Sequence, residues 1–283
     1  MEHITVVGEA LLRLCARQPL EQAEQLQVTC GGAGLKTACT IAGLGGACSL
    51  LACVGEDPFG SRILETLARQ GVDIRQMQRT GRASTGLCFA REGEPDYYPA
   101  PGAERMLTAA LLREELLEKS SLLHVAPMTL GEDPCRFAVQ RAIRTLRQQG
   151  GCISLGLRYH PALWDSPAAW QAAVRSFLPF GDLLTAGQES LVLLTGCPDP
   201  ASAHRMLLGG NCKLICCLSP QGVRLTNPRG TAVVPVEHPL SAAVGAGALL
   251  HGLVREGIRN RDLPRLPHEV LYRLAEFTAL HAV

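Results

Sequence analysis

Short apolar, β-branched runs alternate with longer segments of helical period along almost the whole chain. This alternation is typical of a mostly parallel sheet whose strands are joined by crossover helices. It therefore predicts an α/β fold. The expected strands are residues 4–7, 48–54, 121–125, 151–155, 182–185, 214–218, 223–226 and 232–236.

Helical periodicity covers most of the intervening segments. Gly71 and Gly150-Gly151 stand just past two of them, where helices often end. The last two strands are expected to form a hairpin across residues 227–230, which read Asn-Pro-Arg-Gly. The expected helices are residues 36–44, 59–70, 109–117, 134–149, 168–178, 202–208 and 242–256.

Two segments do not fit this alternation. Residues 12–29 and 76–101 alternate polar and apolar positions and lack a crossover helix. They predict a small strand-rich lid inserted into the α/β body. Because no low-complexity or Pro/Ser-rich linker divides the chain, we expect a single domain over residues 1–283, which is long enough to bury a substantial core.

The charge balance excludes some partners. Lys plus Arg number 27 against 26 Asp plus Glu, so the net charge of +1 gives no long-range field for nucleic acid. No apolar stretch approaches the roughly 20 residues that cross a bilayer, so no membrane span is predicted. The first residues lack the basic start and apolar run of a signal peptide, and a cytoplasmic location is expected.

The twelve cysteines form no CxxC motif and no Cys/His pattern with zinc spacing. Free cysteine behaves as a small buried hydrophobe. We therefore predict reduced cysteines that pack in the core and no metal site, with a redox or metal role as the alternative.

Three glycine-containing stretches carry the most specific motifs. GEALL begins at Gly8, CGGAGLKTA covers residues 30–38 and VGEDPFG covers residues 54–60. Their order and spacing resemble the ribokinase-like or PfkB family of carbohydrate kinases, in particular its fructokinase and 2-keto-3-deoxygluconate kinase branch. Residues 84–87, 153–164 and 189–196 extend the resemblance over nearly the whole chain. It implies a three-layer α/β/α sandwich with a small β-rich lid.

The resemblance also implies a reaction, the transfer of the γ-phosphoryl group of ATP to a sugar hydroxyl with Mg²⁺ as cofactor. Such a site needs a base, backbone N–H groups at a helix N-terminus and a cation. The family pattern places the substrate cleft at Gly31, Gly32, Arg13, Lys36 and Arg158. It places the nucleotide side at Gly187, Glu189, Ser219 and Gly222.

The catalytic motif departs from this pattern. The family's DTTGAGD falls on residues 237–243, so the anion-hole positions are Leu240, Ser241, Ala242 and Ala243. Ala243 stands at the position of the base, and an alanine methyl cannot accept a proton. Losing a positioned general base costs about 10² to 10⁴ in rate. Glu237 is the candidate substitute base, and Ser241 is expected to cap the following helix.

Other polar positions of the motifs have changed as well. Arg13 and Lys36 replace an Asp and an Asn, Gly156 and Arg158 replace another Asp and Asn, and Gly187 stands at the first polar position of the family's NxxE motif. Arg13 and Lys36 either form a basic cleft for an anion such as a sugar phosphate or carboxylate, or reach into solvent.

Two hypotheses follow. The first is a catalytically degenerate kinase homologue that binds a sugar or sugar-derived anion, or a protein partner, and forms a homodimer through its lid. The second is an active ATP-dependent sugar kinase in which Glu237 is a relocated base.

Overall fold

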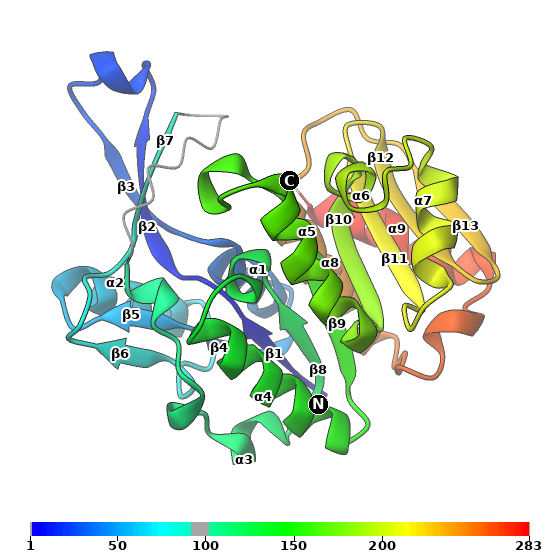
Figure 1. Ribbon diagram of the computed structural model, residues 1–283, viewed down its shortest axis with the longest axis horizontal. Coiled ribbons are helices and arrows are strands. Elements are labelled where there is room, and N and C mark those ends of the chain that lie inside the picture. The colour runs from blue at the N-terminus through cyan, green and yellow to red at the C-terminus, as the bar shows by residue number, and fades with distance from the viewer. Residues whose placement is uncertain (1, 92–101, 283) are drawn as a thin grey trace.

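Eight strands form the central sheet of the computed structural model, which describes residues 2–91 and 102–282 (Figure 1). The spatial order is β13-β12-β11-β10-β9-β8-β1-β4, parallel from β4 to β11 and antiparallel at β12 and β13. Every predicted strand contributes, which confirms the α/β fold. The strands are β1 His3–Val7, β4 Ala47–Leu51, β8 Ser120–Val125, β9 Cys152–Leu157, β10 Leu183–Gly187, β11 Leu214–Ser219, β12 Gly222–Asn227 and β13 Gly230–Val234.

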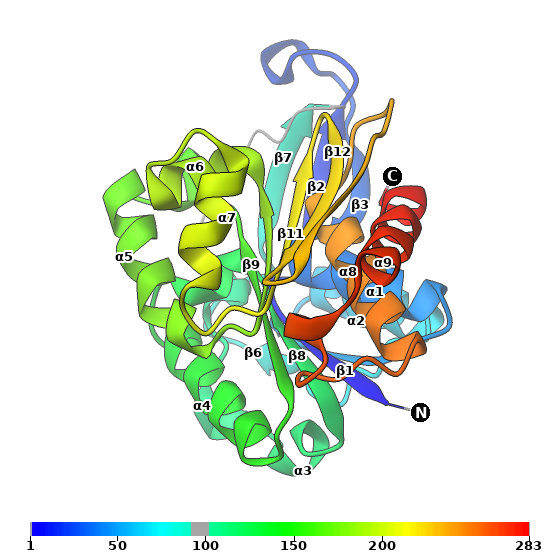
Figure 2. The ribbon, with the colours of Figure 1, turned by 90° about the vertical axis from the view of Figure 1, so that its right-hand side faces the viewer.

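Helices cover both faces of the sheet (Figure 2). Successive residues of a strand point to opposite faces. Thus Leu183 joins the core beneath α1, α8 and α9, and Leu184 joins the core beneath α4 to α7. These two cores confirm the three-layer sandwich. The helices are α1 Ala33–Gly43, α2 Pro58–Arg69, α3 Glu114–Leu117, α4 Cys135–Gln148, α5 Pro167–Phe177, α6 Gln188–Thr195, α7 Pro200–Leu208, α8 Ala242–Arg255 and α9 His268–His281.

Two expected elements are interrupted. The predicted strand 48–54 breaks at Ala52, and β5 (Cys53–Gly55) leaves the central sheet to pair with β6 (Gln78–Thr80). The predicted helix 109–117 is a 3-10 turn followed by the short α3. The chain is extended between them at Arg113, whose carbonyl oxygen accepts a bond of 2.9 Å from the Gln76 side chain. A tertiary hydrogen bond therefore overrides the local helical pattern.

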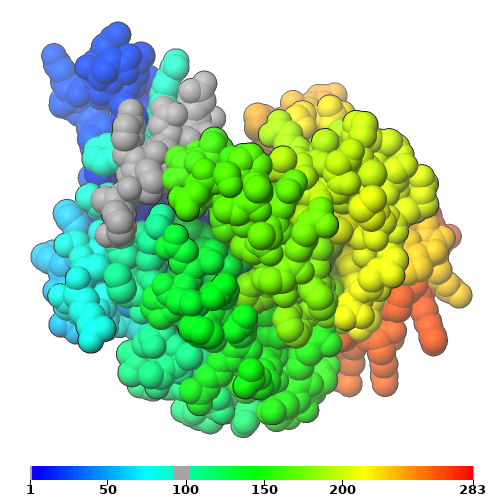
Figure 3. Space-filling view, viewed as in Figure 1, coloured from blue at the N-terminus to red at the C-terminus, as the bar shows by residue number. Residues whose placement is uncertain are grey.

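A three-stranded lid projects from the body (Figures 1 and 3). It consists of β2 (Leu11–Ala16), β3 (Gln27–Gly31) and β7 (Leu87–Arg91), in the order β3-β2-β7. Strands β2 and β3 lie at the two ends of the first predicted lid segment, residues 12–29. The start of the second predicted lid segment, 76–101, is not lid, because β6 belongs to the small sheet with β5 and its Gln78 amide bonds the Thr108 carbonyl oxygen at 2.9 Å. Residues 92–101 of that segment lie outside the described residues.

Eight of the twelve cysteines are buried and four are partly exposed. Burial raises the pKa of the Cys135 thiol to about 11 and that of Cys217 to about 11, so both thiols stay protonated. The interpretation of cysteine as a core residue is confirmed for these eight. Over residues 2–91 and 102–282, none of the helices combines the length and the apolar character needed to cross a membrane.

His124 in β8 is buried at 2% exposure, and its Nδ1 lies 2.9 Å from Ser154 Oγ. Burial lowers the pKa of this imidazole to about 4, below the ordinary value of 6.5. Between these values the unfolded chain binds more protons than the folded chain, so acidification favours unfolding.

We therefore expect His124 to remove about 2 kcal/mol from the free energy of unfolding between pH 7 and pH 5. Urea denaturation of the wild type and of His124→Gln at both pH values measures this contribution, because the glutamine amide can still bond Ser154 without titrating. His268→Gln changes an exposed histidine and is the control. An equal pH dependence in all three proteins contradicts the assignment.

Candidate functional site

The candidate site lies where the carboxyl ends of the parallel strands meet the base of the lid and the N-termini of α1 and α8. Thr37 Oγ1 in α1 donates a hydrogen bond of 2.9 Å to the Ala243 carbonyl oxygen in the first turn of α8. Glycines permit this close approach, because a Cβ at Gly247 would lie 2.8 Å from the Thr37 carbonyl oxygen. The two helix N-termini are thus fixed relative to each other.

The structure brings Arg13, Lys36 and Arg158 together from β2, α1 and the chain after β9. Burial, and then the positive charges of Arg13 and Arg158, lower the pKa of Lys36. Across the described part of the chain, none of the three forms an ion pair with a carboxylate. We call these three residues the basic cluster. It concentrates positive charge at a place where a ligand anion can neutralise it.

Gly31 and Gly32 shape the floor beneath the basic cluster. A Cβ at Gly31 would lie 2.5 Å from Arg13 Cδ, so the arginine side chain lies across this glycine. Gly32 precedes α1 with φ +105°, and a Cβ there would overlap with the Glu9 carbonyl oxygen. Gly32 therefore requires glycine, whereas a side chain at Gly31 would displace the Arg13 side chain.

The N-terminus of α8 offers backbone donors. Ser241 N–H is taken by the Ala282 carbonyl oxygen at 2.7 Å, and no acceptor among the described residues pairs with the N–H groups of Ala242, Ala243 and Val244. Free N–H groups at the positive end of a helix attract anions. The Ser241 hydroxyl makes no capping bond, so the expected capping role is wrong. The Leu240 side chain is partly buried and packs against the core beneath α1, α8 and α9.

A cavity of about 430 Å³ lies beside the end of β11. Ser219, Glu237 and Leu240 are among its lining residues, and Glu237 is exposed. Gly187 ends β10 next to Leu218, another lining residue. Three of the sequence-predicted residues therefore meet around one cavity.

Two of the predicted nucleotide-side residues form a tight turn, and a third lies outside the lining of this cavity. Gly222 has φ +133° in a tight turn where a Cβ would overlap with the Val234 carbonyl oxygen. Ser219 Oγ bonds the Gly222 carbonyl oxygen at 3.3 Å in the same turn. Glu189 is exposed in the first turn of α6 and does not line the cavity.

Few protein ligands are available for a metal ion. The described residues contain no group of three His, Cys, Asp or Glu side chains placed to hold one. A Mg²⁺ ion at this site would be held mainly by nucleotide phosphates and water, as Mg²⁺ usually is.

The sequence analysis assigned no role to Glu9 or Glu104. Glu9 Oε1 accepts a bond of 2.5 Å from Ala33 N–H at the start of α1. A carboxylate at the N-terminus of a helix is stabilised by the helix dipole. The sequence signal for Glu9 was its place as the second residue of the GEALL motif, and Glu104 had none.

Comparison with known proteins gives consistent results. Residues 1–252 match the family described as pfkB family carbohydrate kinase. The chain is 25% identical to probable fructokinase-7 of Arabidopsis thaliana over 268 residues, which is 89% of this chain and 78% of that protein. It is 30% identical to fructokinase-1 of Oryza sativa subsp. japonica over 171 residues, which is 59% of this chain and 53% of that protein.

Solved structures share the fold. A PfkB protein from Polaromonas sp. JS666 superimposes with a TM-score of 0.84 at 23% identity, over 99% of this chain and 95% of that chain. A fructokinase with bound ATP from Xylella fastidiosa superimposes with a TM-score of 0.84 at 22% identity, over 98% of this chain and 91% of that chain. A putative ribokinase II from E. coli in complex with ATP and Mg²⁺ superimposes with a TM-score of 0.84 at 22% identity, over 100% of this chain and 93% of that chain. The expected ribokinase-like fold is confirmed.

Proposed function

The chain belongs to the pfkB family of carbohydrate kinases, and on that premise we propose that it binds a sugar-derived anion under its lid and transfers phosphate poorly. The observation that carries the proposal is the basic cluster of Arg13, Lys36 and Arg158, which forms no ion pair with a carboxylate in the described parts of the chain. The charge of Arg158 acts electrostatically on the buried Glu9 carboxyl group. A neutral sugar would leave the three cations without an ion pair, whereas a phosphate or carboxylate group pairs with them.

The surroundings of the basic cluster support an anionic ligand. Lys36 is in α1, and the Thr37 bond to Ala243 holds the free N–H groups of α8 against the same helix. Side-chain cations and a helix N-terminus attract the same kind of group. We therefore assign the sugar part of the ligand to the floor at Gly31 and Gly32, and its anionic group to the basic cluster.

Poor phosphoryl transfer rests on Ala243, which has no proton acceptor in its side chain. The alternative is an active ATP-dependent sugar kinase with Glu237 as its base. It is favoured by one observation, that Glu237 lines the cavity at the end of β11. In this alternative, Gly187, Glu189, Ser219 and Gly222 flank the nucleotide, and Mg²⁺ arrives with it.

We further propose that residues 1–283 form one domain and that two copies pair through their lids. The lid projects from the body, and its outer strands β3 and β7 have no further neighbour among the strands of the described chain (Figure 1). Unpaired strand edges favour association with another sheet. Sedimentation equilibrium of the full chain measures this assembly.

Isothermal titration calorimetry tests the anion proposal. We expect fructose 6-phosphate or 6-phosphogluconate to bind at least 10-fold more tightly than fructose, because only the former bring an anion to the basic cluster. Lys36→Met removes one charge at nearly constant volume and should lower the affinity for the anionic ligand at least 10-fold. Lys119→Met, at an exposed site before β8, is the matched control and should have no effect.

Two results would overturn the proposal. Equal affinity for fructose and its phosphate would mean that the basic cluster does not contact the ligand. Tight binding of MgATP, with phosphate transfer that Glu237→Gln abolishes, would establish the alternative.

A further inference from the structure

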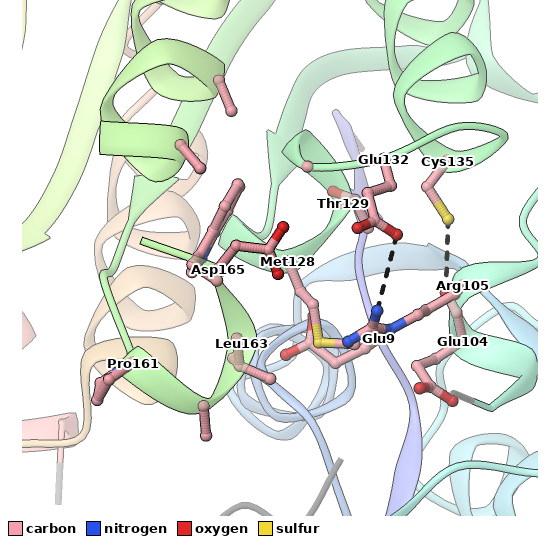
Figure 4. Close-up of a pocket in the computed structure, with 15 residues that line it drawn as sticks. Glu9, Glu104, Arg105, Met128, Thr129, Glu132, Cys135, Pro161, Leu163 and Asp165 are labelled. Atoms are coloured by element: carbon pink, nitrogen blue, oxygen red, sulfur yellow. Dashed lines mark hydrogen bonds and ion pairs between the residues drawn. The ribbon is translucent and has the colours of Figure 1, made fainter. Parts of the chain in front are cut away.

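A second cavity, of about 510 Å³, lies between the chain after β8, the chain after β9, and helices α4 and α5 (Figure 4). Glu104, Arg105 and Cys135 stand on one side of it, and Asp165 and Leu163 on the other. None of the three residues of the basic cluster lines it. The cavity adjoins the proposed anion site, because its lining residue Glu9 lies against Gly32 and the charge of Arg158 acts on the Glu9 carboxyl group.

Two buried carboxyl groups line this cavity with one oxygen each unpaired. Glu9 is 6% exposed, its Oε1 bonds Ala33 N–H, and its Oε2 has no hydrogen-bond partner. Glu104 is 7% exposed, its Oε1 accepts from Gly102 N–H at 3.2 Å, and its Oε2 also has no partner. Buried acceptors are nearly always satisfied in folded proteins, so an unsatisfied pair indicates a missing donor.

The lining carries an excess of acidic groups. Glu9, Glu104, Glu132 and Asp165 face one cation, Arg105, which already pairs with Glu132 at 3.7 Å. Burial raises the pKa of Glu9 and of Glu104, although the charge of Arg158 opposes this shift at Glu9 and the charge of Arg105 opposes it at Glu104. A positively charged donor would satisfy both the hydrogen bonding and the charge.

The rest of the lining suits a hydrocarbon chain and an aromatic contact. Trp164, Leu163, Met128, Ala162, Ala169 and Ala173 contribute apolar surface. Indole rings and carboxylates together are the groups that bind ammonium and guanidinium ligands in proteins. The described residues offer no cluster of three ligands for a metal ion here, which favours an organic cation.

We propose that this cavity binds a small aliphatic amine or guanidine, with its charged end at the carboxyl groups of Glu9 and Glu104 and its hydrocarbon chain against Trp164. Since Glu9 Oε1 also bonds the N-terminus of α1, the bound cation contacts the residue that positions the helix carrying Lys36. The proposal does not depend on the anion site being occupied.

Calorimetry with agmatine, putrescine and 1,4-butanediol tests the proposal on the full chain. Putrescine and 1,4-butanediol have the same carbon skeleton and differ in charge. We expect agmatine or putrescine to bind at least 10-fold more tightly than the diol. Glu9→Gln keeps an acceptor for Ala33 N–H and should lower the affinity for the amine at least 10-fold.

A second pair of variants covers the case in which Glu9→Gln does not fold. Ala169 and Ala172 are both exposed on α5, but only Ala169 lines the cavity. Ala169→Phe should abolish amine binding by filling the cavity, and Ala172→Phe should leave it unchanged. Equal affinity for the diol and the diamine, no binding of either amine, or equal binding by the two Phe variants would overturn the assignment.

Discussion

The purified protein should transfer phosphate from MgATP to hexoses and sugar acids about 10² to 10⁴ times more slowly than a family relative with aspartate at the position of Ala243. The reason is chemical, because the methyl group of Ala243 cannot take the proton of the attacking hydroxyl. The Thr37 hydroxyl donates a hydrogen bond of 2.9 Å to the Ala243 carbonyl oxygen. This bond holds the first turn of α8 in place, and the Ala243 side chain there offers no base. A coupled assay of ADP release, run beside such a relative, measures the difference.

Two variants separate this expectation from a relocated base. Glu237→Gln should leave the residual rate unchanged, as should Glu276→Gln, an exposed control on α9. If Glu237 were the base, its replacement would lower the rate at least 100-fold, and Glu276→Gln would not. A wild-type rate equal to that of the relative, together with that loss, would establish an active kinase.

The fold could be predicted because its information is local. Alternating apolar runs identified all eight strands of the central sheet, and helical period identified most helices. The errors arose where long-range contacts decide. The break at Ala52 depends on β5 pairing with β6, and the break at Arg113 depends on a hydrogen bond from Gln76. Neither partner is visible in the pattern around the break.

The candidate site was predictable only in part. The resemblance to PfkB kinases located Arg13, Lys36 and the start of α8, and the structure places them around neighbouring helix N-termini. That Arg13 and Arg158 lie close enough to lower the pKa of Lys36 is a property of three elements brought together by folding. The unsatisfied oxygens of Glu9 and Glu104 likewise depend on burial, for which no spacing rule exists.

Replacing Gly34 by alanine should cost about 3 kcal/mol or more of unfolding free energy, which is the upper range for overpacking a rigid site. Gly34 in α1 faces Gly8 at the end of β1. An added Cβ at Gly34 would lie 2.6 Å from Gly8 Cα and 2.7 Å from Gly8 C. Both atoms belong to the backbone, so no side chain can rotate away. The strand is also held by Gly8 N–H, which bonds the Leu51 carbonyl oxygen at 3.1 Å.

Gly43, in the last turn of the same helix, is the matched control. It is exposed and has nothing within 4 Å of an added Cβ. Gly43→Ala should therefore stabilise the protein by about 0.4–1 kcal/mol, because alanine has less conformational freedom to lose on folding. Urea denaturation measures the free energy of unfolding of both variants. If β1 approaches α1 as closely as described, this free energy falls below the wild-type value for Gly34→Ala and rises above it for Gly43→Ala. A Gly34→Ala variant as stable as Gly43→Ala would mean that α1 can move away from β1, and Lys36 with it.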